Sequence, residues 1–236
     1  MNSPAIEKKS RPRRILRWLS WILVVGSVVL GTAHVAWKYS GSSEWVQVID
    51  ERGIKIFVRK TPGSTLRDIR AVTRVRGRLM TAVASLAGET QQEDCSAWME
   101  GCMGQKNIVP YDRQNLTVTD LITVKYPPPF RPREFLVAMK AWQDPVTKVV
   151  TVDYKAVPDL IPRNDSYYRV PDMHNVWLFT PRQDGHVDVD YTFHLDQGIP
   201  YPMFNRVAPR IIFKLIEDLP KHWEKYKDVQ LEGIRE

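Results

Sequence analysis

The segment His186–Asp196 carries the densest set of side chains that could do chemistry. Polar residues occupy every second position of it: His186, Asp188, Asp190, Thr192 and His194. Alternate residues of a strand point to one face, so these imidazoles and carboxylates would gather there as potential metal ligands. Alternating polar residues are also ordinary on the solvent face of a strand, and the spacing defines no complete ligand shell. We interpret this face as solvated and expect neither a metal nor a cofactor.

The other face of the same segment is apolar. It consists of Val187, Val189, Tyr191, Phe193 and Leu195. A face of aromatic and branched side chains must be buried, and in a sheet curved around a cavity it would line the pocket.

Three other residues are conceivable acids or bases in a pocket: Asp120, Tyr168 and His174. No catalytic motif supports them, because G-x-S-x-G, H-E-x-x-H, G-x-x-x-x-G-K-[ST] and G-x-G-x-x-G are all missing from the sequence. We interpret each as a structural or surface residue and expect no enzyme.

The chain has two cysteines, Cys95 and Cys102. Seven residues of straight helix rise about 10.5 Å, whereas a disulfide needs Cα atoms within roughly 7 Å. Gly101 could end a helix and fold Cys102 back, so a disulfide and two buried thiols both stay open. No Cys/His cluster has the spacing of a zinc site.

A long apolar stretch near the N-terminus predicts a membrane span. Trp18–Trp37 is twenty residues without Asp, Glu, Lys or Arg, and ~20 apolar residues cross ~30 Å of hydrocarbon. Six Lys and Arg residues precede it and only Lys38 follows closely. The positive-inside rule then leaves the N-terminus in the cytoplasm and residues 39–236 across the membrane, which is the periplasm if the organism is a Gram-negative bacterium. The alternative is a cleaved signal peptide, with Gly31 and Ala33 before the cut, and a secreted or periplasmic domain.

The net charge of +7 belongs almost entirely to this anchor. Residues 1–38 hold seven Lys or Arg and one Glu, a net of +6, which leaves about +1 for the remainder. Binding of nucleic acid needs positive charge clustered on the folded domain. We therefore expect no nucleic-acid partner, and the 198 remaining residues fit one domain, which we expect to be monomeric.

After the anchor, hydrophobic periodicity predicts mostly strands, with a small number of helices between them. A short helix is expected over Glu44–Asp50, then strands at 54–58 and 66–76, then two helices, at 79–88 and around 95–99. The later strands are expected at Lys106–Tyr111, Leu116–Lys125, Phe135–Gln143, Lys148–Val157, Val176–Thr180 and His186–Leu195.

The segment Met203–Asp228 predicts a long amphipathic helix. Its apolar stripe would consist of Phe204, Val207, Ile211, Leu215, Leu219 and Trp223. Pro209 and Pro220 are expected to kink or restart it. The opposite face is basic, which we interpret as solvated surface, with contact to anionic headgroups as the alternative. This helix is the obvious cover for the apolar face of the sheet.

Four motifs in order resemble a known family. They are Trp45 with Gly53-Ile54-Lys55-Ile56-Phe57 and Arg59; Trp98-Met99; Pro127-Pro128-Pro129-Phe130-Arg131-Pro132-Arg133-Glu134-Phe135; and Asp196-Gln197-Gly198-Ile199-Pro200 with Asn205. Together they resemble the START domain, the lipid-transfer fold of steroidogenic acute regulatory protein and its relatives.

The resemblance implies an α+β helix-grip fold, in which a curved antiparallel sheet surrounds a hydrophobic cavity closed by the C-terminal helix. The expected organisation is a cytoplasmic tail (1–17), an anchor (18–38), a linker (39–43), the START domain (44–230) and a short tail (231–236). The implied function is membrane-anchored binding or transfer of a lipid or other hydrophobic small molecule, with the helix as lid. The alternative is a helix-grip cyclase or hydrolase that acts on a hydrophobic substrate.

The cavity and lid residues expected from this resemblance are Asp120, Ile122, Met139, Val189, Tyr191, Phe193, Phe204, Val207, Ile211 and Leu215. Asp120 resembles the acid of the sterol-binding relatives, but Met139 stands where they have arginine. We expect Asp120 to find water or a hydrogen bond instead. Arg133 is expected to be structural and to pair with Glu134 or a neighbouring acid.

Overall fold

The computed structural model describes residues 11–87, 95, 99 and 101–236. The helices are α1 (Arg11–Tyr39), α2 (Leu79–Ala87), α3 (Tyr201–Trp223) and the 3₁₀ turn η3 (Glu224–Tyr226). The strands are β1 (Trp45–Glu51), β2 (Ile54–Arg59), β3 (Asp68–Arg76), β4 (Cys102–Asp112), β5 (Thr117–Val124), β6 (Arg133–Gln143), β7 (Val150–Ala156), β8 (Tyr168–Arg169), β9 (Asp172–Pro181) and β10 (His186–Asp196).

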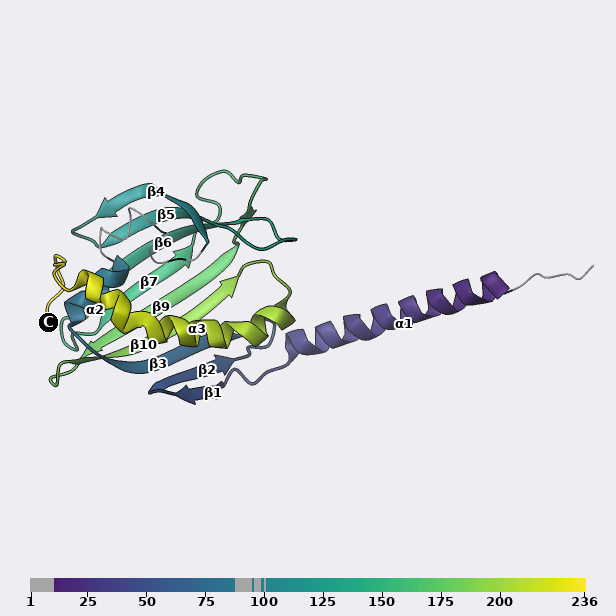
Figure 1. Ribbon diagram of the computed structural model, residues 1–236, viewed down its shortest axis with the longest axis horizontal. Helices are drawn as coiled ribbons and strands as arrows, with labels where there is room; N and C mark the ends of the chain where they lie inside the picture. Colours follow the sequence, from purple (N-terminus) through teal and green to yellow (C-terminus); the bar gives the residue numbers. More distant parts are fainter. Residues whose placement is uncertain (1–10, 88–94, 96–98, 100) are drawn as a thin grey trace, which may run out of the picture.

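The strands form a ten-stranded sheet in the order β1-β2-β3-β10-β9-β7-β6-β5-β4, with β8 paired to the start of β6. Every neighbouring pair along this path is antiparallel, and only the two-residue β8 runs parallel to its partner. Figure 1 shows α3 lying along one face of this sheet. The structure therefore confirms the predicted helix-grip architecture of an antiparallel sheet with a C-terminal covering helix.

The helix predicted over Glu44–Asp50 is wrong, because Trp45–Glu51 is the edge strand β1. It forms a hairpin with β2 through the two-residue turn Arg52-Gly53, in a register that places Trp45 opposite Arg59. The Arg59 guanidinium lies 4.5 Å from the Trp45 ring centroid. Pairing with a buried strand has overridden the weak local helical pattern, as tertiary context often does.

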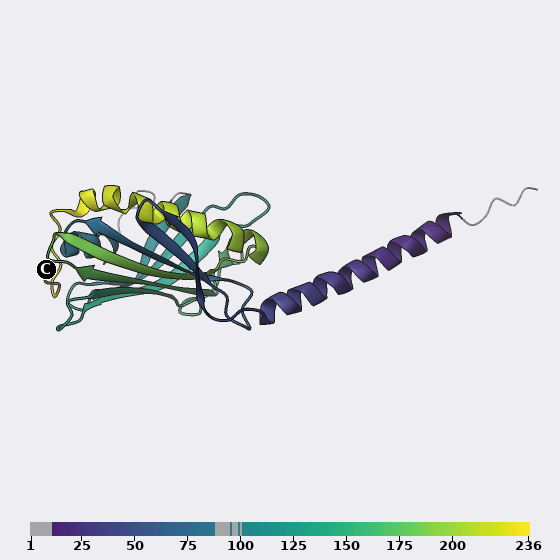
Figure 2. The ribbon, with the colours of Figure 1, turned by 90° about the horizontal axis from the view of Figure 1, so that it is seen from below.

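Helix α3 covers one face of the sheet. It packs on β2 and β3, and α2 packs near its C-terminal end (Figure 2). The helix does not restart at the prolines, since it is continuous through Pro209 and Pro220. It starts at Tyr201 with a proline in its first turn, where no backbone donor is lost.

The C-terminal carbonyl groups of α2 accept hydrogen bonds from the sheet. Tyr154 Oη donates to the carbonyl of Leu86 at 2.6 Å, and Tyr111 Oη donates to that of Ala87 at 2.8 Å. Helix ends leave such carbonyl groups without intrahelical partners, and buried ones must be satisfied. The two tyrosines therefore fix α2 over β4 and β7.

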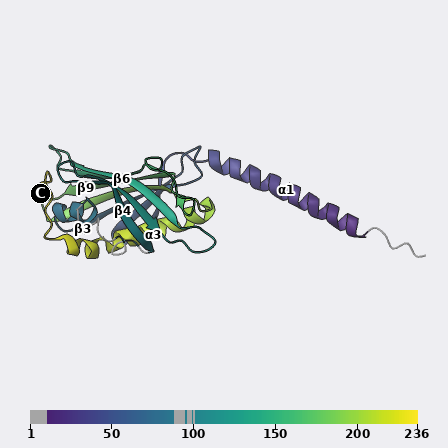
Figure 3. The same cartoon turned by 90° about the horizontal axis from the view of Figure 1, so that it is seen from above.

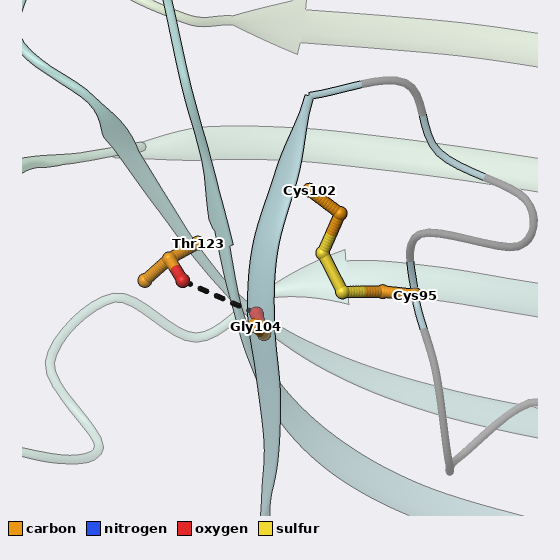
Figure 4. Close-up of a disulfide and its surroundings, with 4 residues drawn as sticks. All are labelled: Cys95, Cys102, Gly104 and Thr123. Atoms are coloured by element: carbon orange, nitrogen blue, oxygen red, sulfur yellow. Dashed lines mark hydrogen bonds between the residues drawn. A yellow bond between two sulfur atoms is a disulfide. The ribbon is translucent and has the colours of Figure 1, made fainter.

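Cys95 and Cys102 are joined by a disulfide, with Cα atoms 5.9 Å apart (Figure 4). Cys102 is the first residue of β4, and two residues later the carbonyl of Gly104 accepts a hydrogen bond from Thr123 Oγ1 at 3.2 Å. The bond thus attaches Cys95 to the start of an edge strand. Most of the helix predicted around residues 95–99, including Trp98, lies outside the described residues.

Helix α1 leaves the domain from one end and shares no face with the sheet (Figure 3). Its segment Ile15–Tyr39 is long and apolar enough to cross a membrane. Almost all described side chains of this segment are exposed, and only a few near its C-terminal end are partly buried. An exposed apolar helix of this length is not the core helix of a soluble domain.

Candidate functional site

The candidate site is the interior between the sheet and α3. The predicted alternation of β10 is confirmed, because Val187, Val189, Tyr191 and Leu195 are buried and the polar residues between them are half-exposed. The same register continues across the sheet, where Tyr191 lies opposite Trp177 on β9. The inner face is therefore apolar over several strands.

Aromatic rings form a continuous row through this interior. The row runs through Trp223, Phe179, Trp177, Tyr191, Phe193 and Phe204, with successive ring centroids 3.8–6.3 Å apart. Its tightest member is the Trp177–Tyr191 stack at 3.8 Å. Because Phe204 and Trp223 belong to opposite ends of α3, the row connects both ends of the helix to strands β9 and β10. Such rings supply large apolar contact area to a bound hydrophobic molecule.

One polar cluster interrupts the apolar interior. Asp120 on β5 is 7 % exposed, and Asn107 Nδ2 on β4 donates a hydrogen bond to its carboxylate at 2.7 Å. This is the hydrogen bond expected for a buried acid in place of an ion pair. Burial raises the pKa of the Tyr154 hydroxyl, and the negative charge of Asp120 raises it further. The cluster offers a ligand hydroxyl an acceptor in otherwise apolar surroundings.

The other expected cavity residues on the sheet are well placed. Ile122 and Met139 are buried on the inner face, and Met139 lies between Val118 and Tyr154 in the register of β5, β6 and β7. Phe193 is half-buried and touches Phe204. Ile122, Met139, Val189 and Tyr191 belong to one buried cluster, and Phe193 packs against it.

The prediction of which face of α3 is buried is wrong for the middle of the helix. The side chains of Val207, Ile211 and Leu215 are 40 %, 59 % and 42 % exposed. The buried face consists of Phe204, Asn205, Ala208, Ile212, Phe213, Ile216, Leu219 and Trp223. Steps of four residues drift by about 40° each around a helix of 3.6 residues per turn. The predicted stripe takes this step four times, from Val207 to Trp223, so it drifts around the helix. The buried face also includes the polar Asn205 and the small Ala208, which an apolar pattern does not indicate.

The turn before α3 is held by Arg133, the first residue of β6. Its guanidinium donates to the carbonyl of Gln197 at 2.8 Å and lies 4.5 Å and 4.8 Å from the ring centroids of Tyr126 and Tyr168. Gly198 has a φ of +66°, and a Cβ atom there would lie 2.3 Å from Tyr168 Cζ. Only glycine fits this approach. The proline-rich loop before β6 and the turn into α3 are thus one packed unit.

Arg133 does not pair with Glu134, contrary to expectation. Glu134 instead accepts two hydrogen bonds from Arg169, at 3.0 Å and 2.9 Å, and the two side chains are 5 % and 3 % exposed. Arg169 also donates to the carbonyl of Pro158 at 2.8 Å. A fully buried ion pair of this kind needs such additional bonds to offset its desolvation. Sequence neighbours on a strand point to opposite faces, so they rarely pair.

Two of the three conceivable acids or bases lie outside the interior. The side chain of His174 is 51 % exposed and contacts Asp153 on the outer face. Tyr168 packs on Arg133 at the end of the domain. On the same outer face, His194 contacts Asp68 at 2.7 Å and Asp172 at 3.2 Å. Among the described residues, no three His, Cys, Asp or Glu side chains are placed to hold a metal ion.

A hollow of about 250 Å³ lies at strands β5, β6 and β7. Its lining includes Thr117, Thr119, Lys140, Asp153 and Lys155, and also Val118 and Met139, which the strand register places opposite each other on the inner face. Charged and apolar side chains therefore both border this hollow.

Sequence analysis missed several residues of the site. Tyr154 and Trp177 contribute to the interior, and Asn107, itself exposed, donates a hydrogen bond to the buried Asp120. For Tyr154 and Trp177, alternation along their strands was a usable signal. Nothing local distinguishes Asn107, whose partner Asp120 lies 13 residues away in sequence. Asn205 belongs to the fourth motif, but the motif does not indicate its partner in the loop after β2, 138 residues away.

No family model matches this sequence. An uncharacterised protein of Pseudomonas aeruginosa is 23% identical over 190 residues, which cover 79% of this chain and 87% of that protein. Two solved structures superpose with a TM-score of 0.66. The STAR-related lipid transfer protein of Xanthomonas axonopodis is 24% identical, over 76% of this chain and 98% of that one. Human STARD10 is 13% identical, over 80% and 76%. The domain therefore has the START fold, as the motif resemblance implied.

Proposed function

We propose that this protein binds a lipid or other hydrophobic small molecule between the sheet and α3, with α3 as the lid and α1 as a membrane anchor. The observation that carries the proposal is the inner face itself. It combines an aromatic row, from Phe204 to Trp223, with the buried Asp120, whose carboxylate accepts a hydrogen bond from the exposed Asn107. Removal of apolar ligand surface from water supplies about 25 cal/mol per Å², and the polar pair would orient a hydroxyl group. The structurally similar Xanthomonas axonopodis protein is a STAR-related lipid transfer protein, which supports the same class of ligand.

The placement of the acids and bases favours binding over catalysis. His174 is on the outer face and Tyr168 packs at the end of the domain, which leaves Asp120 as the interior acid of the three. Asp120 already accepts a hydrogen bond from Asn107. A carrier needs no more than this, whereas an enzyme of the cyclase or hydrolase type would need positioned partners for proton transfer.

The anchor and the disulfide support a location across a membrane. Ile15–Tyr39 has the length of a span, and disulfides persist in oxidising compartments. We propose that the N-terminus stays in the cytoplasm and that the domain faces the periplasm or the exterior. If the segment is instead a signal peptide, the mature chain isolated from membranes would lack it.

The test is extraction of bound lipid from the full chain. The protein is purified in mild detergent, analysed by native mass spectrometry, and its extract is compared with that of the empty detergent. A stoichiometric apolar molecule, recovered chemically unchanged after incubation, supports the proposal. A new product that the variant Asp120→Asn no longer forms would establish an enzyme instead. If the folded protein yields no bound molecule, the result contradicts both the carrier and the enzyme.

A further inference from the structure

The end of α1 is built into the domain rather than attached by a flexible linker. The indole Nε1 of Trp37 donates a hydrogen bond to the carbonyl of Thr65 at 2.8 Å. Its ring stacks on Tyr201, the first residue of α3, with centroids 6.1 Å apart and planes 9° apart. One turn earlier, the ring of His34 lies 5.6 Å from that of Tyr201. The last turn of α1 therefore contacts the first turn of α3 directly.

The loop between β2 and β3 completes this junction. The carbonyl of Thr65, which accepts from Trp37, also accepts from Asn205 Nδ2 at 3.0 Å. The backbone N–H of Arg67 in turn donates to Asn205 Oδ1 at 3.0 Å. One loop thus holds both helices, and the buried Asn205 side chain uses both its Nδ2 and its Oδ1 atoms to bind that loop.

The short linker after α1 is pinned as well. Gly63 N–H donates to the carbonyl of Lys38 at 2.8 Å, and Ser43 N–H donates to that of Lys60 at 3.2 Å. Gly41 has a φ of +108°, and a Cβ atom there would lie 2.1 Å from the carbonyl oxygen of Lys60. The chain approaches the loop so closely that the linker has little freedom.

The length of the apolar run sets the depth of this junction in a bilayer. Residues 18–37 match the hydrocarbon thickness of ~30 Å, so Trp37 falls in the interfacial layer, where tryptophan is preferred. His34 lies about 4.5 Å deeper along the helix axis. Tyr201 touches both residues, so it must lie at their level.

We propose that the first turn of α3 and the β2–β3 loop lie in the interfacial layer of the bilayer that holds α1, so that the interior exchanges ligand with this same bilayer. The inference rests on the membrane anchorage proposed above. Met203 is 46 % exposed and follows Tyr201 by two residues, about 3 Å along the helix. The turn held by Arg133 lies at the same end of the domain, because it immediately precedes α3.

The rest of α3 leads away from the membrane in this arrangement. Figures 1 and 2 both show α3 extending from its junction with α1 toward the far end of the domain. Leu215 lies fourteen residues beyond Tyr201, or about 21 Å along the helix, whereas each headgroup layer is only about 5–8 Å deep. Met203 and Leu215 are similarly exposed, at 46 % and 42 %, so they form a matched pair that differs in predicted depth.

The experiment measures this depth with a fluorescent probe. The full chain with Met203→Cys or Leu215→Cys is labelled with an environment-sensitive dye under non-reducing conditions, which keep Cys95 and Cys102 bonded, and is reconstituted into vesicles that contain brominated phospholipid. We expect blue-shifted emission and several-fold stronger quenching at position 203 than at position 215. Equal, water-like emission at both positions would overturn the proposal.

A second variant tests the role of the junction. Trp37→Ala, with a far-UV spectrum and cooperative unfolding like those of the parent, should shift the probe at position 203 toward water-like emission and leave that at position 215 unchanged. A probe at 203 that stays in the interfacial layer would show that the junction does not set the depth. Carbonate extraction and the mass of the chain distinguish a wrong anchor from a wrong depth. A cleaved or extractable protein refutes the anchor, whereas an intact, membrane-embedded protein with a water-like probe at position 203 refutes only the depth.

Discussion

The Nε atom of Arg133 donates a hydrogen bond to the backbone carbonyl of Gln197 at 2.8 Å, which joins the first residue of β6 to the turn that starts α3. These two residues are 64 positions apart in sequence. Three aromatic rings, of Tyr126, Phe130 and Tyr168, surround the same guanidinium within 5.4 Å. The turn that starts α3 is therefore positioned by the guanidinium of Arg133.

Replacement of Arg133 should loosen the turn before α3. Arg133→Met is expected to lower the free energy of unfolding by about 2 kcal/mol, because a buried charged hydrogen bond contributes about 1.5–3 kcal/mol. Urea unfolding measures the loss, and hydrogen exchange of residues 197–204 should become faster. The exposed neighbour provides the control, since Arg131→Met should change neither quantity appreciably. Equal protection of the turn in both variants would refute the positioning role.

The Glu134–Arg169 pair should behave as a buried ion pair. Glu134→Leu or Arg169→Met alone is expected to cost about 3–5 kcal/mol, because each leaves an unpaired buried charge. The double variant should cost much less than the sum, and a double-mutant cycle by urea unfolding measures the difference. The exposed pair Arg163–Asp159 is the control, with an expected coupling below about 1 kcal/mol. Additive effects at Glu134 and Arg169 would contradict the assignment.

Two adjacent isoleucines of α3 should respond oppositely to the same charge. Ile212 is 3 % exposed and faces the interior, whereas Ile211 is 59 % exposed. Ile212→Asp should destabilise the domain by at least about 2–5 kcal/mol and release the bound lipid, since even truncation of a buried isoleucine costs this much. Ile211→Asp should stay within about 0.5 kcal/mol of the parent and retain the lipid. Lipid loss from the folded Ile211→Asp variant would mean that the outer face of α3 holds the ligand.

His194 should make the stability of the domain depend on pH. Its hydrogen bond to Asp68 raises the pKa of His194 against the effect of burial, and Asp172 contributes in the same direction. A raised folded-state pKa means that the stabilisation is complete below the unfolded value of about 6.5 and is lost as the pH rises through the folded value. The free energy of unfolding of the parent should exceed that of His194→Gln by about 0.5–1 kcal/mol near pH 6, and by less at pH 8.

The matched control for this effect removes the partner. Burial works to raise the pKa of Asp68, but hydrogen bonds from His194 and Arg59 outweigh it and leave this pKa lowered. The carboxylate is therefore charged throughout the window between pH 6 and 8. In an Asp68→Asn background, His194→Gln should change the pH dependence of urea unfolding much less, because only the smaller effect of Asp172 on His194 remains. An unchanged pH dependence in the parent and in His194→Gln would refute the coupling.

Patterns that depend only on local geometry were predictable from the sequence. The alternation of β10 identified its buried face, because a strand has a period of two and one of its faces must leave water. The apolar run of α1 identified a long helix by composition alone. The four ordered motifs indicated the fold, and the pairing of Trp45 with Arg59 shows that two of their residues meet across one hairpin.

Tertiary structure alone decided which residues lie together across long distances in sequence. A helix of 3.6 residues per turn can present several overlapping apolar stripes, and only packing on β2 and β3 selects Ile212 over Ile211. Arg133 and Glu134 are adjacent in the chain, yet the pleat sends them to different partners. The contact of Trp37 with Tyr201 joins residues 164 positions apart, and no local pattern encodes it, because it exists only once the sheet brings both helices to one end.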